Sequence, residues 1–378
     1  MHVLVFGRTL PTKKTGSLGL FEFEQAGVLA AYAKVGYIFL ETDSILTTRK
    51  IRKINENYRG IDTVGYYFPL GRSLGSLYSQ VRFKLFKKLF REYRAAYGKP
   101  DLIHVHFPTM ILTDEIIDFI REQGIELVLT EHWSWIKEKK ISEEQAAVLK
   151  HAVSAAKTTI CVSEDLKHSI QELTGKEGGE KLRVIANMIS DEFFQPYERE
   201  KKQDDDFVFT YIGSLKELKR VDLLIRSFQD LFQNKQAVKL NIVGDGPERK
   251  TLEGLVSRDC KDQVKFRGSL PKDQVFEVLT GTDVYVSASH YESFGVPFIE
   301  ALAMGIPVIA SSNMPIVIYL DDSKGVIFED GNREDLSRKM NYMYENIDNF
   351  EHQQVRSGIF EQFNGDQLAR KLMAIYEA

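Results

Sequence analysis

The chain has 378 residues, a formal net charge of -4 and only two cysteines. Because this length exceeds what one hydrophobic core usually organises, we expect two domains of roughly 150 to 200 residues each. The mildly acidic balance excludes a general attraction for nucleic acid, and the sequence has no basic arm or zinc-ligand spacing that would create a local one. No apolar run reaches the ~18 residues that cross a bilayer, so we expect a soluble protein.

The first strand-like run begins at His2, which leaves no room ahead of it for a secretory leader. We therefore expect a cytoplasmic protein. Cys161 and Cys260 lie far apart in the sequence, with no metal-ligand spacing around either. This pattern predicts buried reduced thiols and no metal site.

Short apolar runs that are typical of strands alternate with helix-like segments along the whole chain. In the first half these runs are HVLVF from His2, DLIHVHF from Asp101, ELVLTEH from Glu126 and TTICVS from Thr158. In the second half they are FVFTYIG from Phe207, VKLNIVG from Val238, DVYVSAS from Asp283 and PVIAS from Pro307. Near-continuous apolar strands between helices are typical of parallel sheets covered on both faces. The sequence therefore predicts an α/β protein with two doubly wound Rossmann-like domains.

A polar, charged segment without an apolar periodicity separates the two halves, as expected of an exposed connection. We place this linker at 196–206, between an N-terminal domain at 1–195 and a C-terminal domain at 207–378. The segment from Asn364 spaces its apolar residues at helical intervals, which predicts a closing helix. That helix either stays with its own domain or packs back onto the N-terminal one.

The segment 77–97 predicts a basic amphipathic helix. Its apolar face carries Val81, Leu85, Phe86, Leu89, Phe90 and Tyr93. Its other sides carry Arg82, Lys84, Lys87, Lys88, Arg91 and Arg94. We favour a helix docked on its domain with a solvated basic side. The alternative is peripheral contact with the inner face of an anionic membrane.

The stretch HYESFGVPFIEALAMGIPVIAS from His290 to Ser311 predicts a strand end, a tight loop and a short helix. Pro297 suits the first helical turn, and Gly305 suits the left-handed position just after the last one. The N–H groups of Gly295 and Val296 are then free at the positive end of the helix, which predicts a phosphate site.

Glu292 and Glu300 flank this predicted phosphate site, one in the loop and one on the helix. A carboxylate accepts two hydrogen bonds from neighbouring hydroxyls, which suits a ribose or hexose diol. Spacing alone would leave two glutamates on a solvated helix face. The surrounding glycines and prolines favour a binding site instead.

The pattern E-x7-E followed by A-x-x-x-G-x-P-V-I resembles the signature of glycosyltransferase family 4, which has the GT-B fold of two Rossmann-like domains facing a central cleft. In the second domain, GSLKELKRVDLLI from Gly213, VGDGPER from Val243 and VKFRGSLP from Val264 resemble further motifs of the family. In the first domain, GSLGLFEFEQAGVLA from Gly16 and LTEHWSW from Leu129 resemble it more loosely.

The resemblance implies a retaining transfer of a hexose-type sugar from a nucleotide-diphosphate sugar. For a cytoplasmic enzyme whose helix at 77–97 could contact a membrane, we expect a glycan or lipid-linked acceptor, in surface polysaccharide or glycolipid assembly. A UDP-sugar is the expected donor and a GDP-sugar the alternative. The resemblance implies no cofactor and no metal. The sequence does not disclose the acceptor or the linkage.

The resemblance also assigns roles. Glu292 would contact the transferred sugar, with His132 beside it, and Glu300 would hold the ribose hydroxyls. Lys219 would hold the pyrophosphate, where a fixed ammonium stabilises the charge that builds on the leaving phosphate. The other implied donor-binding residues are Gly16, Gly19, Ser214, Arg220, Leu270, Phe294, Gly295 and Val296.

The resemblance does not assign the second cation that would hold the phosphates, because the family often has arginine where this chain has Ser214. Lys216 and Arg220 are the nearby cations. His104 and His106 are predicted to be core or edge residues of their strand.

Three other functions remain to be weighed. A GT-B epimerase would use the same site but consume donor without an acceptor. A catalytically silent protein would bind the sugar nucleotide and turn nothing over. A nicotinamide dehydrogenase is disfavoured because no G-x-G-x-x-G follows the first strand.

Overall fold

The computed structural model of the chain describes residues 1–12, 18–42, 50–71, 75–197 and 206–378. These residues form two compact units. Unit 1 consists of 1–186 together with 365–378, and unit 2 of 187–364. Unit 1 thus ends before residue 195, and the C-terminal segment belongs to it. Most of the predicted linker at 196–206 lies outside the described residues.

Unit 1 contains an eight-stranded sheet in the order β3-β4-β2-β1-β5-β6-β7-β8. Its strands are β1 (His2–Gly7), β2 (Lys34–Thr42), β3 (Arg52–Tyr58), β4 (Ile61–Phe68), β5 (Leu102–His106), β6 (Glu126–Glu131), β7 (Thr158–Cys161) and β8 (Leu182–Val184). All neighbours pair in parallel except β3 and β4, which form an antiparallel pair at the edge. The sheet is therefore parallel throughout its interior.

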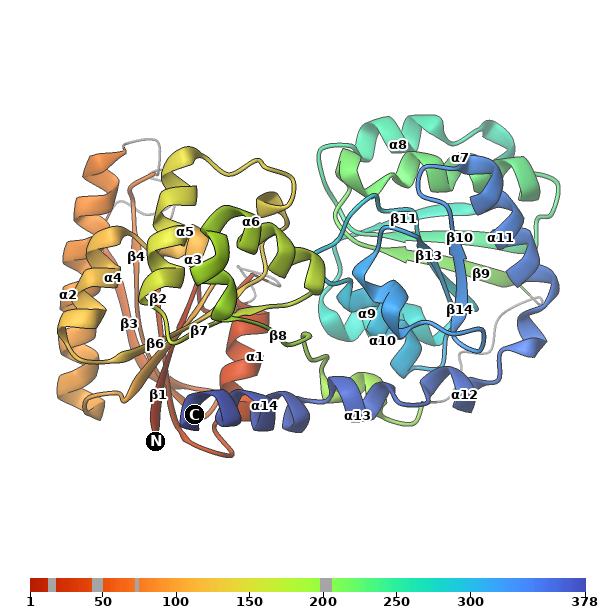
Figure 1. Cartoon of the computed structure of the whole chain (residues 1–378). Coiled ribbons are helices and arrows are strands. Elements are labelled where there is room, and N and C mark those ends of the chain that lie inside the picture. Colours follow the sequence, from red (N-terminus) through yellow and green to blue (C-terminus); the bar gives the residue numbers. More distant parts are fainter. Residues whose placement is uncertain (13–17, 43–49, 72–74, 198–205) are drawn as a thin grey trace. The chain divides into compact units, whose positions relative to one another are not determined.

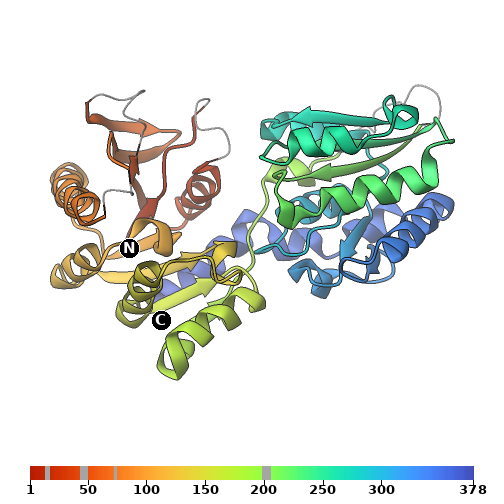
Figure 2. The same cartoon turned by 90° about the horizontal axis from the view of Figure 1, so that it is seen from above.

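Helices cover both faces of this sheet, and Figure 2 shows α1 and α2 on opposite sides of it. The helix α14 packs on α1, whereas α4 contacts α2 and α5, and α6 contacts α5. The bounds are α1 (Leu20–Leu29), α2 (Ser76–Tyr97), α3 (Pro108–Ile111), α4 (Asp114–Glu122), α5 (Glu143–Ala155), α6 (Glu164–Glu180) and α14 (Gly365–Glu377). Because layers lie on both sides, the central strand β1 is buried along its whole length.

Unit 2 contains a six-stranded sheet in the order β11-β10-β9-β12-β13-β14, with every pair parallel. The strands are β9 (Phe207–Ile212), β10 (Val238–Val243), β11 (Val264–Gly268), β12 (Val284–Ser287), β13 (Val308–Ser311) and β14 (Gly325–Phe328). The helices are α7 (Val221–Phe232), α8 (Arg249–Leu255), α9 (Lys272–Thr280), α10 (Val296–Ala303), α11 (Arg333–Glu345), α12 (His352–Arg356) and α13 (Ile359–Phe363).

The helices of unit 2 also form two layers. Figure 1 shows α7 and α8 above the sheet and α9 and α10 below it. The core on the α7 side includes Phe209, Phe228 and Phe232, whose side chains are fully buried. The predicted α/β architecture with two doubly wound, Rossmann-like units is confirmed.

The apolar face of α2 packs inside unit 1. Leu85, Phe86, Leu89, Phe90 and Tyr93 are buried, and the helix contacts β2, β4 and α4. The helix is thus docked on its own sheet, with several of its basic side chains exposed on the other side.

Arg82 is not on the solvated side of α2, so that part of the prediction is wrong. Its side chain is 2% exposed. The guanidinium donates hydrogen bonds to the carbonyl oxygens of Leu40 at 3.0 Å and Ile111 at 2.8 Å. A buried charge is tolerated here because these main-chain acceptors replace water.

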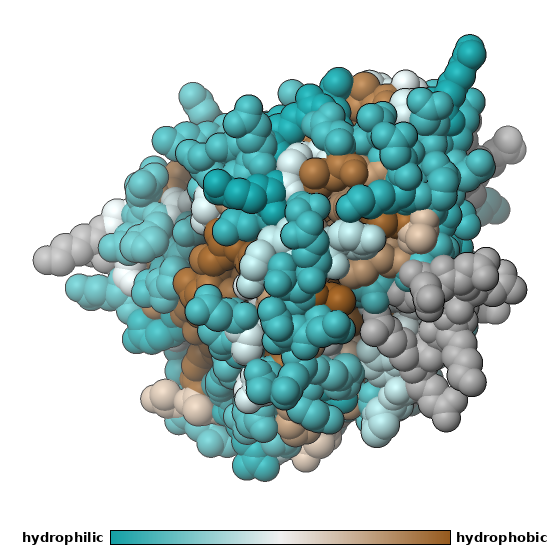
Figure 3. Space-filling view, turned by 90° about the vertical axis from the view of Figure 1, so that its right-hand side faces the viewer, coloured by the Kyte–Doolittle hydropathy of each residue, from teal (hydrophilic) through white to brown (hydrophobic). Residues whose placement is uncertain are grey.

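The face of the molecule seen in Figure 3 is mostly hydrophilic, and hydrophobic side chains reach the surface in separate patches. None of the helices that the structure describes is long and apolar enough to cross a membrane. Cys161 and Cys260 are free and buried, as predicted.

Candidate active site

The predicted donor site lies in unit 2, where loops follow neighbouring parallel strands. Carboxyl ends of such strands share one edge of the sheet, which is where open α/β sheets bind ligands. The loop after β9 is tied to the loop after β10 by a hydrogen bond from the N–H of Leu215 to the carbonyl of Asp245 at 2.9 Å. The loop after β12 joins them, because the N–H of His290 donates to the carbonyl of Leu218 at 2.9 Å.

The glycines of these loops allow the main chains to touch. Gly244 has a φ of 136°, and a Cβ at this position would lie 1.8 Å from the carbonyl oxygen of Gly213. A Cβ on Gly246 would lie 2.3 Å from the carbonyl oxygen of Leu215. Both contacts involve main chain that cannot swing away, so the V-G-D-G turn requires glycine for packing.

The short helix α10 begins and ends as its sequence predicts. Gly295 precedes it with a left-handed φ of 96°, Pro297 lies in its first turn, and Gly305 follows it with a φ of 72°. The left-handed residue turns the chain from the loop into the helix, which leaves the first N–H groups of α10 without helical acceptors. They provide the amide-rich end that a phosphate requires.

Lys219 and Glu292 form an ion pair within this cluster of loops. The Lys219 Nζ lies 2.5 Å from the Glu292 Oε1, and the two side chains are 14% and 24% exposed. The Ser289 hydroxyl also donates to the Glu292 Oε1, at 3.2 Å. Two residues far apart in the sequence are thus brought together beside the start of α10, with enough exposure to meet a ligand.

Glu300 on α10 is buried, with a side chain that is 7% exposed. The Lys272 Nζ lies 3.9 Å from its Oε1 and donates a hydrogen bond to the Ser190 hydroxyl at 2.5 Å. The sequence interpretation missed Lys272, which immediately follows the quoted motif VKFRGSLP. A lysine at the first position of a helix, after a strand and a proline, is the signal that could have found it.

Glu292 and Glu300 both raise the pKa of the buried Tyr285 hydroxyl. The Tyr285 ring is fully buried, and its hydroxyl donates to the Ile212 carbonyl at 3.3 Å. Burial raises the pKa of Tyr285 well above its usual value, and the neighbouring Tyr211, Glu292 and Glu300 raise it further. The two carboxylates therefore both lie near Tyr285, the second residue of β12.

The remaining predicted donor residues of unit 2 occupy different environments. Ser214 is half-buried in the loop after β9, and Leu270 is half-buried between β11 and α9. The Phe294 side chain is buried against Tyr319 and Phe363, so it offers only its main chain to a ligand at the start of α10.

Arg220 connects the 3-10 turn at Glu217–Lys219 to α7. It has a left-handed φ of 47°, unusual for a residue with a side chain, and its Nε donates to Asp222 at 3.3 Å. Lys216, the other candidate clamp, is exposed. Main-chain strain at a polar loop residue is typical of functional sites, so it favours Arg220 as the clamp.

The predicted residues of unit 1 are only partly described. Gly16 lies outside the described residues. Gly19 precedes α1 with a φ of 78°, and a Cβ there would lie 2.4 Å from the carbonyl oxygen of Thr9. Glycine is therefore required for the close approach of these two segments.

His132 follows β6 and belongs to a chain of aromatic rings. Its Nε2 lies 3.0 Å from the His106 Nδ1, and its ring stacks on Phe107 at 4.6 Å. His104 and His106 are fully buried in β5, as predicted. Burial lowers the pKa of both well below the usual histidine value, and each also has a histidine neighbour that lowers it further.

Glu131 holds the start of the loop that carries His132. Its carboxylate is fully buried and accepts hydrogen bonds from the N–H groups of Thr109, His132 and Trp133 and from the Thr109 hydroxyl. Burial raises the pKa of Glu131, and these four donors oppose that effect. Glu131 thus fixes the direction in which the chain leaves β6.

In unit 2 the structure pairs Lys219 with Glu292 in the loop before α10, and it places Glu300 on that helix near Lys272. Gly19 and His132 lie in unit 1. Among the described residues, no group of three or more histidine, cysteine or acidic side chains is arranged to hold a metal ion.

Two family models match the chain. "Glycosyl transferases group 1" matches residues 194–358, and "Glycosyltransferase Family 4" matches residues 43–193. Together they extend over most of both units. The chain therefore belongs to glycosyltransferase family 4, as the motifs of its second half indicated, and it has the GT-B type of fold.

Similar proteins agree with this assignment. The chain is 25% identical to N-acetyl-alpha-D-glucosaminyl L-malate synthase of Bacillus anthracis over 291 residues, which are 73% of this chain and 74% of that protein. It is 27% identical to the phosphatidylinositol N-acetylglucosaminyltransferase gpi3 subunit of Schizosaccharomyces pombe over 249 residues, which are 65% of this chain and 53% of the subunit. The match thus spans only about half the length of the yeast subunit.

Solved structures resemble the whole chain. HepE of Anabaena, solved in complex with UDP, superposes with a TM-score of 0.75 and covers 100% of both chains at 16% sequence identity. This likeness shows the fold, and the family match shows the class of enzyme.

Proposed function

We propose that this glycosyltransferase moves a hexose-type sugar from a UDP-sugar to a glycan or lipid-linked acceptor with retention of the anomeric configuration. The observation that carries the proposal is the contact of Lys219 with Glu292 beside the amide-rich start of α10. A cation for phosphate and a carboxylate for sugar hydroxyls stand side by side, which is the combination that a nucleotide-diphosphate sugar needs. The UDP complex of the similar HepE structure supports the choice of nucleotide.

Lys219 has the central role in the proposed mechanism. The structure places its ammonium 2.5 Å from the Glu292 carboxylate. When the donor binds, the ammonium turns to the diphosphate, and Glu292 accepts hydrogen bonds from the transferred sugar. As the glycosidic bond breaks, the electron pair moves to the phosphate oxygen, whose growing charge Lys219 and the N–H groups of α10 stabilise.

The acceptor attacks from the face that the phosphate leaves. The leaving phosphate oxygen takes the proton of the acceptor hydroxyl while the new glycosidic bond forms, so no enzyme carboxylate is needed as nucleophile. Retention follows because attack and departure occur on the same face of the sugar. His132 of unit 1 is proposed to contact the transferred sugar.

Glu300 is proposed to hold the ribose hydroxyls of the donor. Its position on a short, well-defined helix fixes the carboxylate, and the Lys272 Nζ lies 3.9 Å from its Oε1. A carboxylate can accept a hydrogen bond from each of two neighbouring hydroxyls. The nucleoside is then held at the same helix whose start holds the phosphates.

The proposal is tested by incubating the protein with UDP-glucose, UDP-galactose, UDP-N-acetylglucosamine and GDP-mannose, each with a set of monosaccharide glycosides and lipid-linked sugars. We expect stabilisation of the fold by UDP through mass action, and release of UDP together with a new glycoside of retained configuration in the proton NMR spectrum. A product of inverted configuration contradicts the mechanism, and donor consumption without acceptor favours an epimerase. Binding without turnover of any donor favours a silent binding protein.

Cytoplasmic residence with peripheral membrane contact through 77–97 is a separate part of the proposal. Because the apolar face of α2 is buried in unit 1, the contact would be electrostatic and would use exposed basic residues such as Lys84, Lys88 and Arg91. Co-sedimentation with vesicles should then require anionic lipid and weaken at high salt. Equal binding to neutral vesicles would contradict it.

A further inference from the structure

Two histidines of unit 1 face each other through their ring nitrogens. The Nδ1 of His106, on β5, lies 3.0 Å from the Nε2 of His132, which follows β6. The planes of the two rings are nearly parallel, at 17°. A hydrogen bond between two ring nitrogens needs a proton on one of them and a lone pair on the other. The location of that proton decides whether His132 can donate to a ligand or accept from it.

His106 is a neutral imidazole with a single N–H group. Its side chain is fully buried, and burial lowers its pKa well below the usual histidine value. The neighbouring His132 and the guanidinium of Arg8 lower this pKa further. Arg8 lies over the Phe107 ring at 3.6 Å and pairs with Glu22 at 2.6 Å, which keeps its charge in place. A second proton on the His106 ring is therefore disfavoured at neutral pH.

The Nε2 of His106 is buried and has no hydrogen-bond partner among the described residues. A proton on this nitrogen would leave a buried N–H group without an acceptor, which is rarer in folded proteins than an acceptor with an unused lone pair. His104, on the same face of β5, differs, because its two nitrogens lie 2.6 and 2.7 Å from the hydroxyls of Tyr376 and Thr130. The arrangement favours the proton of His106 on Nδ1, from which it donates to His132.

The ring of His132 is also restrained by aromatic contacts that do not involve His106. It stacks on Phe107 with the centroids 4.6 Å apart, and the Phe21 ring meets it edge-on at 5.5 Å. Phe107 has a left-handed φ of 53°, and strain of this kind in a residue with a side chain is typical of functional sites. Loss of the bond to His106 should therefore change the proton on His132 more than the position of its ring.

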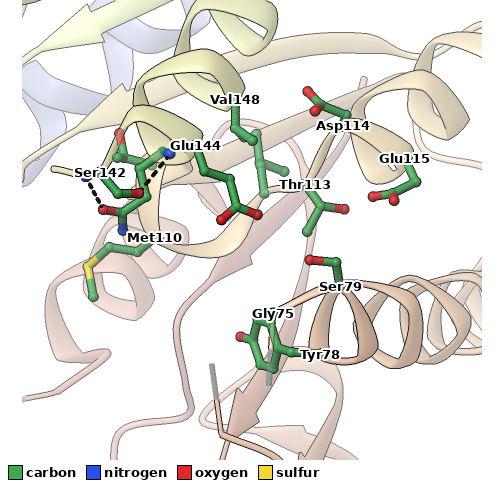
Figure 4. A pocket seen from close by; sticks show the side chains of 13 residues that line it. Gly75, Tyr78, Ser79, Met110, Thr113, Asp114, Glu115, Ser142, Glu144 and Val148 are labelled. Atoms are coloured by element: carbon green, nitrogen blue, oxygen red, sulfur yellow. Dashed lines mark hydrogen bonds between the residues drawn. The ribbon is translucent and has the colours of Figure 1, made fainter. Parts of the chain in front are cut away.

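The main chain at His132 is held by the buried carboxylate of Glu131. It accepts from the N–H groups of His132 and Trp133 at 2.8 and 2.9 Å, and from the Thr109 hydroxyl at 2.5 Å. Thr109 also lines a cavity of about 320 Å³, which Figure 4 shows. Because packing beside Thr109 is incomplete, the hydrogen bonds to Glu131 hold this segment. A substitution of His106 that keeps these bonds should leave the loop in place.

We propose that His106 is a positioning residue, which donates from its Nδ1 to the Nε2 of His132 and fixes His132 as the tautomer with its proton on Nδ1. His132 then offers an N–H group to a ligand, and not a lone pair. The inference rests on the proposed function only where it makes the transferred sugar that ligand, so that His132 donates to a sugar oxygen. The arrangement of protons in the histidine pair stands without it.

The tautomer is measured by long-range proton–nitrogen NMR of the full chain labelled with ¹⁵N-histidine, because protonated and unprotonated ring nitrogens have different chemical shifts. The spectrum is recorded at about pH 8, where a histidine of ordinary pKa is neutral. Among the eight histidines, His132 is identified by the signals that disappear in His132→Gln. We expect its Nδ1 to be protonated and its Nε2 unprotonated. A proton on Nε2, or equal sharing by both nitrogens, would overturn the proposal.

His106→Leu and His106→Asn form a matched pair, since the two new side chains have the same shape and only asparagine keeps an N–H group at the δ position. In His106→Leu, His132 should share its proton between both nitrogens. The kcat/KM for the UDP-sugar should fall by about 3- to 10-fold, the value of one neutral hydrogen bond. His106→Asn should keep the wild-type tautomer and most of the turnover. UDP, which has no transferred sugar, should bind equally to all three proteins.

Equal effects of the two substitutions on the tautomer would overturn the proposal, because only the shape of the side chain would then matter. A changed tautomer in His106→Leu with unchanged kcat/KM would support the role of His106 and count against the proposed contact of His132 with the sugar. His168→Gln, which changes an exposed histidine on α6, should keep the wild-type tautomer and turnover. If His106→Leu failed to fold, the wild-type spectrum would still decide.

Discussion

The Lys219 ammonium lies 2.5 Å from the Glu292 carboxylate, so each of these two side chains restrains the position of the other. The pair is partly exposed, and such pairs contribute little to stability because water competes with them. The main effect of the pair is to fix the positions of the two side chains. The lysine enters from the turn before α7 and the glutamate from the loop before α10, so their meeting point defines where phosphate and sugar would lie.

Replacing Lys219 by methionine should therefore impair turnover far more than folding. We expect kcat/KM to fall by about 10²- to 10³-fold, the range found when one fixed donor to a developing negative charge is removed. The melting temperature should stay close to that of the wild type. Steady-state release of UDP measures the first effect and thermal unfolding the second.

Lys250→Met is the control for Lys219→Met, because Lys250 is an exposed lysine on α8. It should leave kcat/KM unchanged. Near wild-type turnover in Lys219→Met would remove Lys219 from the proposed mechanism.

Glu300 is testable through the hydroxyl that it is proposed to hold. The wild-type protein should bind UDP about tenfold or more tightly than 2′-deoxy-UDP, since a hydrogen bond to a charged group contributes roughly 1.5 to 3 kcal/mol. In Glu300→Gln this preference should shrink to about threefold or less. Calorimetric titration of UDP and 2′-deoxy-UDP into both proteins measures how much of the preference for the 2′-hydroxyl depends on Glu300. If the variant kept the full preference for UDP, Glu300 would not be the residue that holds the ribose.

The strained main chain at Arg220 suggests which cation is the second phosphate clamp. Arg220→Met should weaken the binding of UDP by about tenfold. The binding of uridine, which lacks phosphate, should not change. Lys216→Met should affect neither ligand appreciably, because Lys216 is exposed. If UDP binding were lost only in Lys216→Met, Lys216 and not Arg220 would be the second phosphate-binding cation.

Much of the fold follows from local patterns, and the structure shows why. Each apolar run named from the sequence contains a strand, because a strand that is buried on both faces tolerates few polar residues. The edge strand β3, RKINENY, is mostly exposed and lacks such a run. Its sequence carries no periodic signal that would have predicted it.

The candidate site was predictable only where the sequence itself specifies the geometry. Gly295, Pro297 and Gly305 define the ends of α10 through main-chain preferences, which any reader of the sequence can recognise. Lys272 meets Glu300 through packing between segments that are distant in the sequence. No local spacing encodes that contact.

Arg82 shows the limit of helical periodicity. Its position on the border of the apolar face made a solvated side chain the natural expectation. The acceptors that allow its burial are the carbonyls of Leu40 and Ile111, which come from other parts of unit 1. The sequence pattern of one helix does not show which hydrogen-bond acceptors the neighbouring segments provide.

The buried histidines of β5 predict that unit 1 loses stability in mild acid. His104 and His106 have pKa values well below that of an unfolded histidine, so at pH below about 6.5 the unfolded chain binds protons that the folded chain does not. Their stabilising effect is complete above that pH and is lost as the pH falls. The slope should reach about 1.4 kcal/mol per pH unit for each histidine. The raised pKa of Glu131 acts in the opposite direction at lower pH, so the measurement belongs between pH 7.5 and 5.5.

The test is urea unfolding followed by tryptophan fluorescence, because the two tryptophans of the chain, Trp133 and Trp135, both lie in unit 1. His106→Phe should reduce the loss of unfolding free energy between pH 7.5 and 5.5, since one of the two proton-binding differences is removed and the Glu131 contribution cancels in the comparison. His168→Gln, which changes an exposed histidine on α6, should keep the wild-type pH dependence. If His106→Phe and His168→Gln both followed the wild-type curve, the burial of the β5 histidines would not be the cause of acid sensitivity.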